Sequence, residues 1–221
     1  MQAPDQEDLK RIYAQRFSAQ LDYRNRVWRI LVGRFFSKFI PANATVLDLG
    51  CGYGEFINHV EAACKYAMDL NPDSPAHLNS DVNFLFQDCS QHWQIPDHSL
   101  DVVFTSNFFE HLPDKTSLGK TLDEARRCLK PGGRLVAMGP NIKYLTEAYW
   151  DFWDHHIPLS DLSIREALET RGFTTEDCVD RFLPYTMSRK RPVPGFLIRA
   201  YLEIRPIWRF FGKQFLVVAR S

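Results

Sequence analysis

Short apolar runs alternate with segments of helical periodicity over most of the chain. The runs are rich in β-branched and aromatic residues, as expected of strands that are buried on both faces of a parallel sheet. The segments of this kind are residues 45–50, 65–70, 82–88, 100–106, 133–139, 173–180 and 215–221. Strands that alternate with helices require crossover connections, so the pattern predicts an α/β domain with a mostly parallel sheet.

Apolar side chains also recur at intervals of three and four residues, which is typical of amphipathic helices. The first forty residues predict two such helices before Pro41, with arginines between the apolar positions. The other predicted helices are residues 54–63, a helix that begins at Asn71 and Pro72, residues 117–129, and residues 163–170 with a capping box of Ser163 and Glu166 and a stop at Gly172. The chain has 221 residues, which suits one domain with a full core.

A glycine-rich loop, VLDLGCGYGEF at residues 46–56, follows the first predicted strand. Glycine allows positive φ and lets the backbone approach a ligand closely. A dinucleotide fingerprint would place its third glycine at position 55, but the residue there is Glu55, and Asp48 lies just before the loop. Carboxylates oppose a pyrophosphate at a helix N-terminus, so the loop favours a ligand without phosphate and with positive charge.

Five segments then resemble the motifs of class I, Rossmann-like S-adenosylmethionine-dependent methyltransferases, and the likeness is to the type 11 members. They are DLGCGYG at 48–54, Asp69, Gln87 to Cys89, SNFFEHLPD at 106–114 and LKPGGRLV at 129–136. The resemblance covers roughly residues 27 to 180 and extends to the final pair of strands. It implies a seven-stranded sheet with helices on both faces and an antiparallel last strand. It also implies an N-terminal helical lid or cap at residues 1–40 and a methyltransferase domain at 41–221.

The resemblance also assigns residues to the cofactor, S-adenosylmethionine. Asp69 would accept the two ribose hydroxyls as a charge-assisted bidentate contact, and Asp88 with the Cys89 amide would hold the adenine. The other cofactor residues that it implies are Asp48, Gly50, Cys51, Gly52, Gly54, Leu70 and Ser106. For Asp69 and Asp88 the alternative is a structural role, because aspartate is common in turns at strand ends.

Histidines lie where a methyl acceptor should bind. Transfer from a sulfonium mainly requires alignment, and a general base matters when the acceptor is an alcohol. The candidates are His111 after the fourth predicted strand and the pair His155 and His156 in YWDFWDHHIPLS, where Asp151 or Asp154 could orient an imidazole. The predicted acceptor contacts are Tyr13, Tyr149 and Trp153. The alternatives are that His111 only fixes its loop, that the His155–His156 pair is a half-exposed helix entry, and that the aromatic residues are core.

Global charge gives little direction, because Lys+Arg and Asp+Glu both number 27. No nucleic-acid partner is expected from this balance. Five cysteines without a C-x-x-C pair predict reduced thiols in a cytoplasmic protein, and we expect no metal site because the His155–His156 pair lacks a third ligand at suitable spacing. The polar N-terminus does not resemble a secretory signal.

Residues 184–213 form the one strongly basic segment, with aromatic residues between the cations and a single acid, Glu203. This basic aromatic segment could lie on an anionic membrane at its inner surface or hold a phosphate-bearing acceptor. An ordinary solvated helix is an equal alternative. The end of the chain also resembles bacterial methyltransferases of polysaccharide or glycolipid assembly, which implies a sugar hydroxyl, free or on a lipid carrier, as acceptor.

Three functions therefore compete. The favoured one is O-methylation of a small molecule or glycan. Another is methylation of protein or RNA, which the balanced charge and the residues Ser106 to Phe109 disfavour, because they lack an Asn-Pro-Pro-Tyr-like motif. A third is a dehydrogenase or a non-catalytic nucleotide sensor, which Glu55 disfavours.

Overall fold

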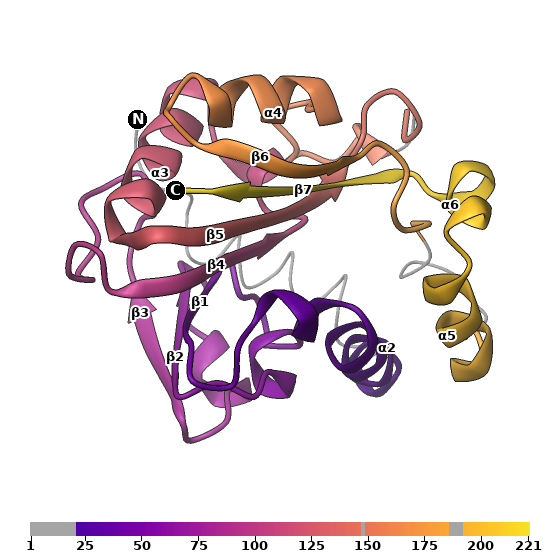
Figure 1. Cartoon of the computed structure of the whole chain (residues 1–221), viewed down its shortest axis with the longest axis horizontal. Helices are drawn as coiled ribbons and strands as arrows, with labels where there is room; N and C mark the ends of the chain where they lie inside the picture. Colours follow the sequence, from indigo (N-terminus) through magenta and orange to yellow (C-terminus); the bar gives the residue numbers. More distant parts are fainter. Residues whose placement is uncertain (1–20, 147–148, 186–191) are drawn as a thin grey trace.

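The computed structural model describes residues 21–146, 149–185 and 192–221. Its centre is a seven-stranded sheet with the order β3-β2-β1-β4-β5-β7-β6 (Figure 1). The strands are β1 (Thr45–Leu49), β2 (Cys64–Asp69), β3 (Val82–Phe86), β4 (Leu100–Ser106), β5 (Leu129–Pro140), β6 (Thr174–Val179) and β7 (Gln214–Arg220). Neighbours from β3 to β5 are parallel, and β7 runs antiparallel to both β5 and β6. The predicted fold class, including the antiparallel last strand, is confirmed.

Five α-helices and four single turns of 3-10 helix surround the sheet in the described residues. The α-helices are α2 (Leu21–Arg34), α3 (Lys115–Cys128), α4 (Asp161–Glu169), α5 (Gly195–Glu203) and α6 (Arg205–Phe211). The 3-10 turns are η2 (Phe36–Phe39), η3 (Ile57–His59), η4 (Ser74–His77) and η5 (Phe109–His111). Tyr13 and the basic residues Arg189, Lys190 and Arg191 lie outside the described part of the chain.

Side chains that alternate along the strands fill a core on each face of the sheet. On β1, Val46 packs into the cluster that contains α2, whereas Leu47 and Leu49 pack into the cluster that contains α3 and α4. Figure 1 shows α3 and α4 on one side of the sheet and α2 on the other. Because α2 shares its buried cluster with the sheet, it packs as part of the same core, and a domain boundary at residue 40 stays a prediction.

Two predicted helices are wrong in the structure. Residues 54–63 form only the turn η3. The Asn58 side chain bonds to the backbone of His77 and Asn79, and the Asn58 carbonyl accepts Nδ2 of Asn79 in place of a helical amide. The helix expected from Asn71 shrinks to η4, since the Asn71 side chain accepts the Asp73 amide and closes a local turn.

The cap of α4 also differs from the prediction. Its N-cap is Ser160, whose hydroxyl accepts a hydrogen bond from the Ser163 amide. The Ser163 hydroxyl in turn accepts one from the Ser160 amide. Ser163 therefore belongs to the capping box as the third helical residue and not as the cap. Gly172 has a φ of 80° just beyond the helix, as the predicted stop requires.

Candidate active site

A cavity of about 960 Å³ opens at the carboxyl ends of β1, β2 and β4. The chain leaves β1 toward β2 on one side and returns to β4 on the other, so this is the point where strand order reverses and where open α/β sheets bind ligands. The volume lies at the upper end of the roughly 300–1,000 Å³ that ligand pockets occupy. It is therefore large enough for a cofactor and a small acceptor side by side.

The glycine loop forms the floor of the cavity next to β1. Gly50, Gly52 and Gly54 have φ values of 72°, 54° and 75°, a region that side chains disfavour. A Cβ on Gly50 would lie 2.2 Å from Cγ of Phe108, so the loop and Phe108 pack at a distance that only glycine allows. Gly50 and Gly52 line the cavity, whereas Gly54 shapes the turn and does not contact it.

Carboxylates concentrate around this loop. Asp48 is buried, and its Oδ2 has no hydrogen-bond partner among the described residues. Burial, followed by the charges of Glu55 and Asp69, raises the pKa of Asp48 well above its usual value. Arg24 of α2 pairs with Glu55 at 2.6 Å and is the cation that bridges α2 to the loop. An unpartnered buried acceptor beside two further acids fits a cationic ligand such as the ammonium of S-adenosylmethionine.

Asp69 ends β2 with its carboxylate held in place by the backbone. Its Oδ2 accepts the Gly52 amide and its Oδ1 accepts the Asn71 amide, both at 2.8 Å. Burial raises the pKa of Asp69, while the hydrogen bonds from Asn71, Gly52 and Leu70 oppose the rise. A carboxylate can accept about four hydrogen bonds, so this group keeps acceptor capacity for a ribose hydroxyl in a fixed orientation.

The predicted adenine residues divide into two groups. Leu70, Cys89 and Ser106 line the cavity, and so does Gln87. Asp88 does not line it, because its Oδ1 accepts both the amide and the hydroxyl of Ser90. The role of Asp88 toward the adenine stays a prediction.

The Cys89 thiol is not a reactive group. Burial raises the pKa of Cys89 to about 12, although a hydrogen bond from Thr121 opposes the rise. Its backbone carbonyl accepts Nε1 of Trp93 at 2.7 Å, which fixes the loop after β3.

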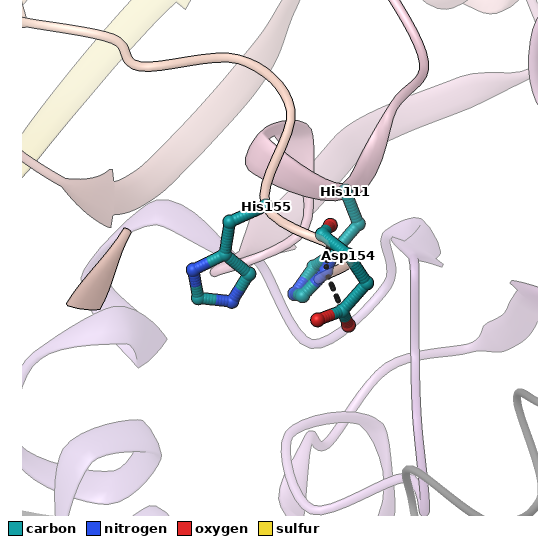
Figure 2. A group of neighbouring side chains, drawn as sticks. All are labelled: His111, Asp154 and His155. Atoms are coloured by element: carbon teal, nitrogen blue, oxygen red, sulfur yellow. Dashed lines mark hydrogen bonds and ion pairs between the residues drawn. The ribbon is translucent and has the colours of Figure 1, made fainter. Parts of the chain in front are cut away.

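On the acceptor side, His111 and Asp154 form a hydrogen-bonded pair (Figure 2). Nδ1 of His111 lies 3.0 Å from Oδ2 of Asp154 and 3.0 Å from its backbone oxygen. Burial alone would lower the pKa of His111, but the hydrogen bond to Asp154 and the charges of Glu110 and Asp154 outweigh it, and the pKa is raised. Nε2 of His111 has no hydrogen bond within the described residues, and the ring lines the cavity.

A second set of contacts holds the segment 149–157 against η5. The Tyr149 hydroxyl donates to the buried Glu110 carboxylate at 2.6 Å, and the Glu110 carbonyl accepts the amides of His156 and Ile157. Nδ1 of His155 lies 2.6 Å from the Tyr149 carbonyl, and its ring meets that of His111 edge-on at 4.8 Å. Glu110 thus ties the two loops that carry the histidines.

The structure brings most of the predicted acceptor residues together. His111, His155, His156 and Tyr149 all line the cavity. Trp153 does not, since it is 88% exposed, and its role as an acceptor contact stays a prediction. Tyr13 lies outside the described residues.

The sequence interpretation missed the α2 side of the cavity and the partner of Asp154. Tyr23, Arg24 and Trp28 of α2 line the cavity. The periodicity in this stretch selects Val27, Leu31 and other apolar positions, and it gives these three residues no role, although the acid Glu55 in the glycine loop could have suggested a nearby arginine. Asp154 was expected to orient a neighbour in sequence, but it orients His111.

His111, Asp154 and His155 also lie close enough together to be considered as metal ligands, with one ligand atom each within 4.8 Å of the others. The sequence did not predict this third ligand. In the present arrangement, the His111 and His155 rings are each fixed through Nδ1, which suits an oriented base as well as a ligand.

Comparison with known proteins agrees with this geometry. A model of the methyltransferase domain family matches residues 20–177. The chain is 31% identical over 130 residues to 2-methyl-6-phytyl-1,4-hydroquinone methyltransferase of Synechocystis sp., a match that covers 52% of this chain and 38% of that enzyme. The chain therefore spans less than half the length of this relative.

Solved structures share the fold at lower identity. A SAM-dependent methyltransferase from Archaeoglobus fulgidus superposes with a TM-score of 0.65 at 23% identity, over 90% of this chain and 94% of the other. One from Mesorhizobium loti gives 0.60 at 19% identity, over 84% and 95% of the two chains. At these identities the likeness establishes the fold alone.

The sheet order, the glycine loop and the acid that ends β2 define the class, a Rossmann-like domain of the S-adenosylmethionine-dependent methyltransferase type. The chain belongs to the methyltransferase domain family, which the match over residues 20–177 shows. The prediction of a class I methyltransferase is confirmed at this level, and S-adenosylmethionine is the cofactor of that class.

Proposed function

We propose that this domain transfers the methyl group of S-adenosylmethionine to a ring hydroxyl of a small amphipathic acceptor, with His111 as the general base. The observation that carries the proposal is the His111–Asp154 pair at the cavity wall. Asp154 fixes the ring through Nδ1, so that Nε2 is the atom left to accept a proton. A base of this kind is needed for an alcohol and not for a carboxylate or thiolate acceptor.

The cofactor end is held by the loop after β1 and the acid after β2. When bound, S-adenosylmethionine supplies an electrophilic methyl on a good leaving group, so the chain mainly has to orient the reactants. Asp48 and its acidic neighbours would balance the ammonium, Asp69 would accept the ribose hydroxyls, and Leu70 with Cys89 would border the adenine. Arg24, through its contact with Glu55, would keep α2 closed over this end as the lid expected from the sequence.

The acceptor end has an apolar wall. Tyr149, Phe152, Leu197 and Phe211 line the same cavity as His111. An acceptor with an apolar chain beside its reactive ring suits these walls better than a free sugar. The named activity of the Synechocystis relative, on a hydroquinone that carries a phytyl chain, supports this class.

A lipid-linked sugar has the same chemistry, so the glycan and glycolipid interpretation of the sequence stays within the proposal. Contact of residues 184–213 with a membrane or a lipid-linked acceptor belongs to it as well. Protein or RNA methylation and nucleotide sensing are less suited to the cavity. A pyrophosphate would meet the carboxylates of Asp48, Glu55 and Asp69, and the nearby cation Arg24 is already paired with Glu55.

The test is to incubate the purified protein with labelled S-adenosylmethionine and two acceptor types, a prenylated hydroquinone and a lipid-linked sugar, and to detect methylated products by mass spectrometry. With the active acceptor, His111→Ala should lower kcat by about 10²-fold or more while adenosylhomocysteine affinity stays unchanged. His92→Ala is the matched control, because His92 is 76% exposed and outside the cavity. Full activity of His111→Ala would refute the assignment of the base.

The pH profile gives an independent check. The base acts in its neutral form, so kcat should rise with pH through the raised pKa of His111. Asp154→Asn removes the negative charge that favours the protonated ring, so the acidic limb should move to lower pH. A chelator should leave kcat unchanged. If a chelator abolished activity and a divalent metal restored it, the function of these residues would be to bind a metal through His111, Asp154 and His155, and His111 would not be the general base.

A further inference from the structure

The lobe formed by α5 and α6 carries the densest group of exposed apolar side chains in the described part of the molecule. It lies at one end of the sheet, beside the start of β7 (Figure 1). Its exposed members are Phe196, Leu197, Ile204, Phe210 and Phe211, with exposed fractions of 68%, 48%, 47%, 80% and 62%. Exposed apolar surface of this extent marks an interaction site in a soluble domain.

The lobe is firmly attached to the domain. Leu202 and Trp208 are buried in the same cluster as α2, and Nε1 of Trp208 donates to the Tyr201 carbonyl at 2.7 Å. The Tyr201 hydroxyl donates to the Phe182 carbonyl at 2.7 Å. Each helix is thus fixed to the core by one buried side chain, while Phe196, Phe210 and Phe211 stay exposed.

Cations alternate with these apolar side chains along the chain. Arg199, Arg205, Arg209 and Lys213 are exposed, and none of them forms an ion pair with a carboxylate among the described residues. Glu203 is the one acid between Gly195 and Lys213. A bilayer with acidic lipids has an anionic surface above an apolar interior. Exposed apolar side chains that alternate with unpaired cations are complementary to both layers.

The mouth of the active-site cavity opens on this lobe. Leu197 and Phe211 line the cavity and are also exposed, whereas their sequence neighbours Phe196 and Phe210 are exposed and do not line it. Phe152 forms another exposed part of the rim. Each helix therefore presents adjacent residues to the cavity and to the outside.

We propose that the α5–α6 lobe docks on the surface of an anionic lipid bilayer and that the acceptor enters the cavity from the bilayer between Leu197 and Phe211. The entry route rests on the proposed amphipathic acceptor, while the docking itself does not. Docking involves partial insertion of side chains only, since no helix in the described ranges is long and apolar enough to cross a membrane. The apolar chain of the acceptor stays among lobe side chains while its ring reaches His111.

Vesicle flotation tests the docking without any acceptor. The full chain is mixed with vesicles of phosphatidylcholine alone or with 30% phosphatidylglycerol, a vesicle composition chosen as the probe. We expect at least tenfold stronger binding to the anionic vesicles, and a loss of most of that difference in 0.5 M salt because screening weakens charge attraction. Equal binding to both vesicle types, or none to either, would overturn the proposal.

Matched substitutions identify the surface. Phe196→Glu and Phe210→Glu should each lower binding to anionic vesicles at least tenfold. Leu162→Glu on α4 and Phe86→Glu on β3 change side chains that are 48% and 50% exposed elsewhere, and should bind as the parent does. Equal losses in both pairs would show that the lobe is not the docking surface.

Charge substitutions and two further measurements complete the test. Arg199→Ala with Arg209→Ala should remove the preference for anionic lipid. Adenosylhomocysteine affinity should be unchanged in every variant, because none of these residues lines the cavity. A parent chain that is dimeric in solution, becomes monomeric with Phe210→Glu and does not bind vesicles would assign the lobe to self-association and refute docking. Failure of methyl transfer with intact vesicle binding would instead count against the proposed function alone.

Discussion

The proposed contact of Asp69 with the ribose diol gives the sharpest test of the cofactor site. Asp69→Ala removes a buried carboxylate that the Gly52 and Asn71 amides hold in a fixed orientation. A hydrogen bond to a charged group contributes about 1.5–3 kcal/mol. Because two hydroxyls are involved and part of the gain offsets desolvation, we expect a loss of about 2 kcal/mol or more, which is about 30-fold in the dissociation constant.

Calorimetry with adenosylhomocysteine measures this loss, but the substitution also frees the two amides and loosens the loop. A ligand that lacks both ribose hydroxyls separates the two effects. The parent protein should bind adenosylhomocysteine about 30-fold more tightly than its dideoxy analogue, whereas Asp69→Ala should bind both about equally. Asp81→Ala is the control, since that carboxylate is 62% exposed and pairs with Lys65 away from the cavity.

The affinity for adenosylhomocysteine at acidic pH gives a second test of the contact between Asp69 and the ribose. Burial raises the pKa of Asp69, so its protonation occurs at less acidic pH than for an exposed aspartate. Affinity for adenosylhomocysteine should fall as the pH falls through this raised pKa, because the protonated group accepts fewer hydrogen bonds. If the parent protein did not distinguish the dideoxy analogue, Asp69 would be a structural residue of the loop and the ribose assignment would be wrong.

Other substitutions test the loop, the α2 contact and the core. Gly50→Ala places a Cβ 2.2 Å from the Phe108 ring at a residue with positive φ. Adenosylhomocysteine affinity measured by calorimetry should therefore fall at least tenfold, which is about 1.4 kcal/mol. Retained affinity would mean that Phe108 moves aside. Arg24→Ala removes the ion pair that Glu55 forms at 2.6 Å. The free energy of unfolding, measured by urea denaturation, should fall by about 1–3 kcal/mol. The double variant Arg24→Ala with Glu55→Ala should lose less than the sum of the two single variants. Phe36→Ala leaves a cavity at a fully buried position among aromatic rings. It should lower the free energy of unfolding by about 3–5 kcal/mol in the same assay. A decrease of less than about 1 kcal/mol would show that the neighbouring rings fill the cavity.

Sequence patterns located the sheet well because its strands are separate apolar runs whose positions need no tertiary information. The short segments after β1 and β2 were less predictable. Residues 54–63 have the composition of a helix, but Asn58 accepts hydrogen bonds from both the backbone amide and the side chain of Asn79, so a tertiary contact decides the conformation. Propensity is a weak guide where side chains can replace helical hydrogen bonds with others.

The candidate site was predictable as far as topology determines it. Acids at the ends of β1 and β2 must meet at one edge of a parallel sheet, and Asp48 and Asp69 do line the same cavity. The direction of a ring or carboxylate is not fixed by its place in the chain. Asp154 is adjacent to His155 in sequence, yet its carboxylate pairs with His111 because η5 brings that ring beneath it.

Proton uptake and release connect the acidic loop to its ligand. Burial and the neighbouring acids raise the pKa of Asp48 well above its usual value. Between the pKa of the unfolded chain and that of the folded protein, Asp48 is therefore protonated in the folded protein without ligand and ionised in the unfolded chain. Stability should therefore decline as the pH rises from the unfolded pKa toward the folded one, and Asp48→Asn should flatten this decline in thermal melts.

A cationic ligand favours the ionised carboxylate, so binding should lower the pKa of Asp48 and release protons into the buffer. Calorimetry in two buffers of different ionisation enthalpy counts these protons, and Asp48→Asn should abolish the release that comes from this group while weakening affinity. If the variant released as many protons as the parent protein, the ammonium would not lie beside Asp48, and the unpartnered Oδ2 would need another explanation.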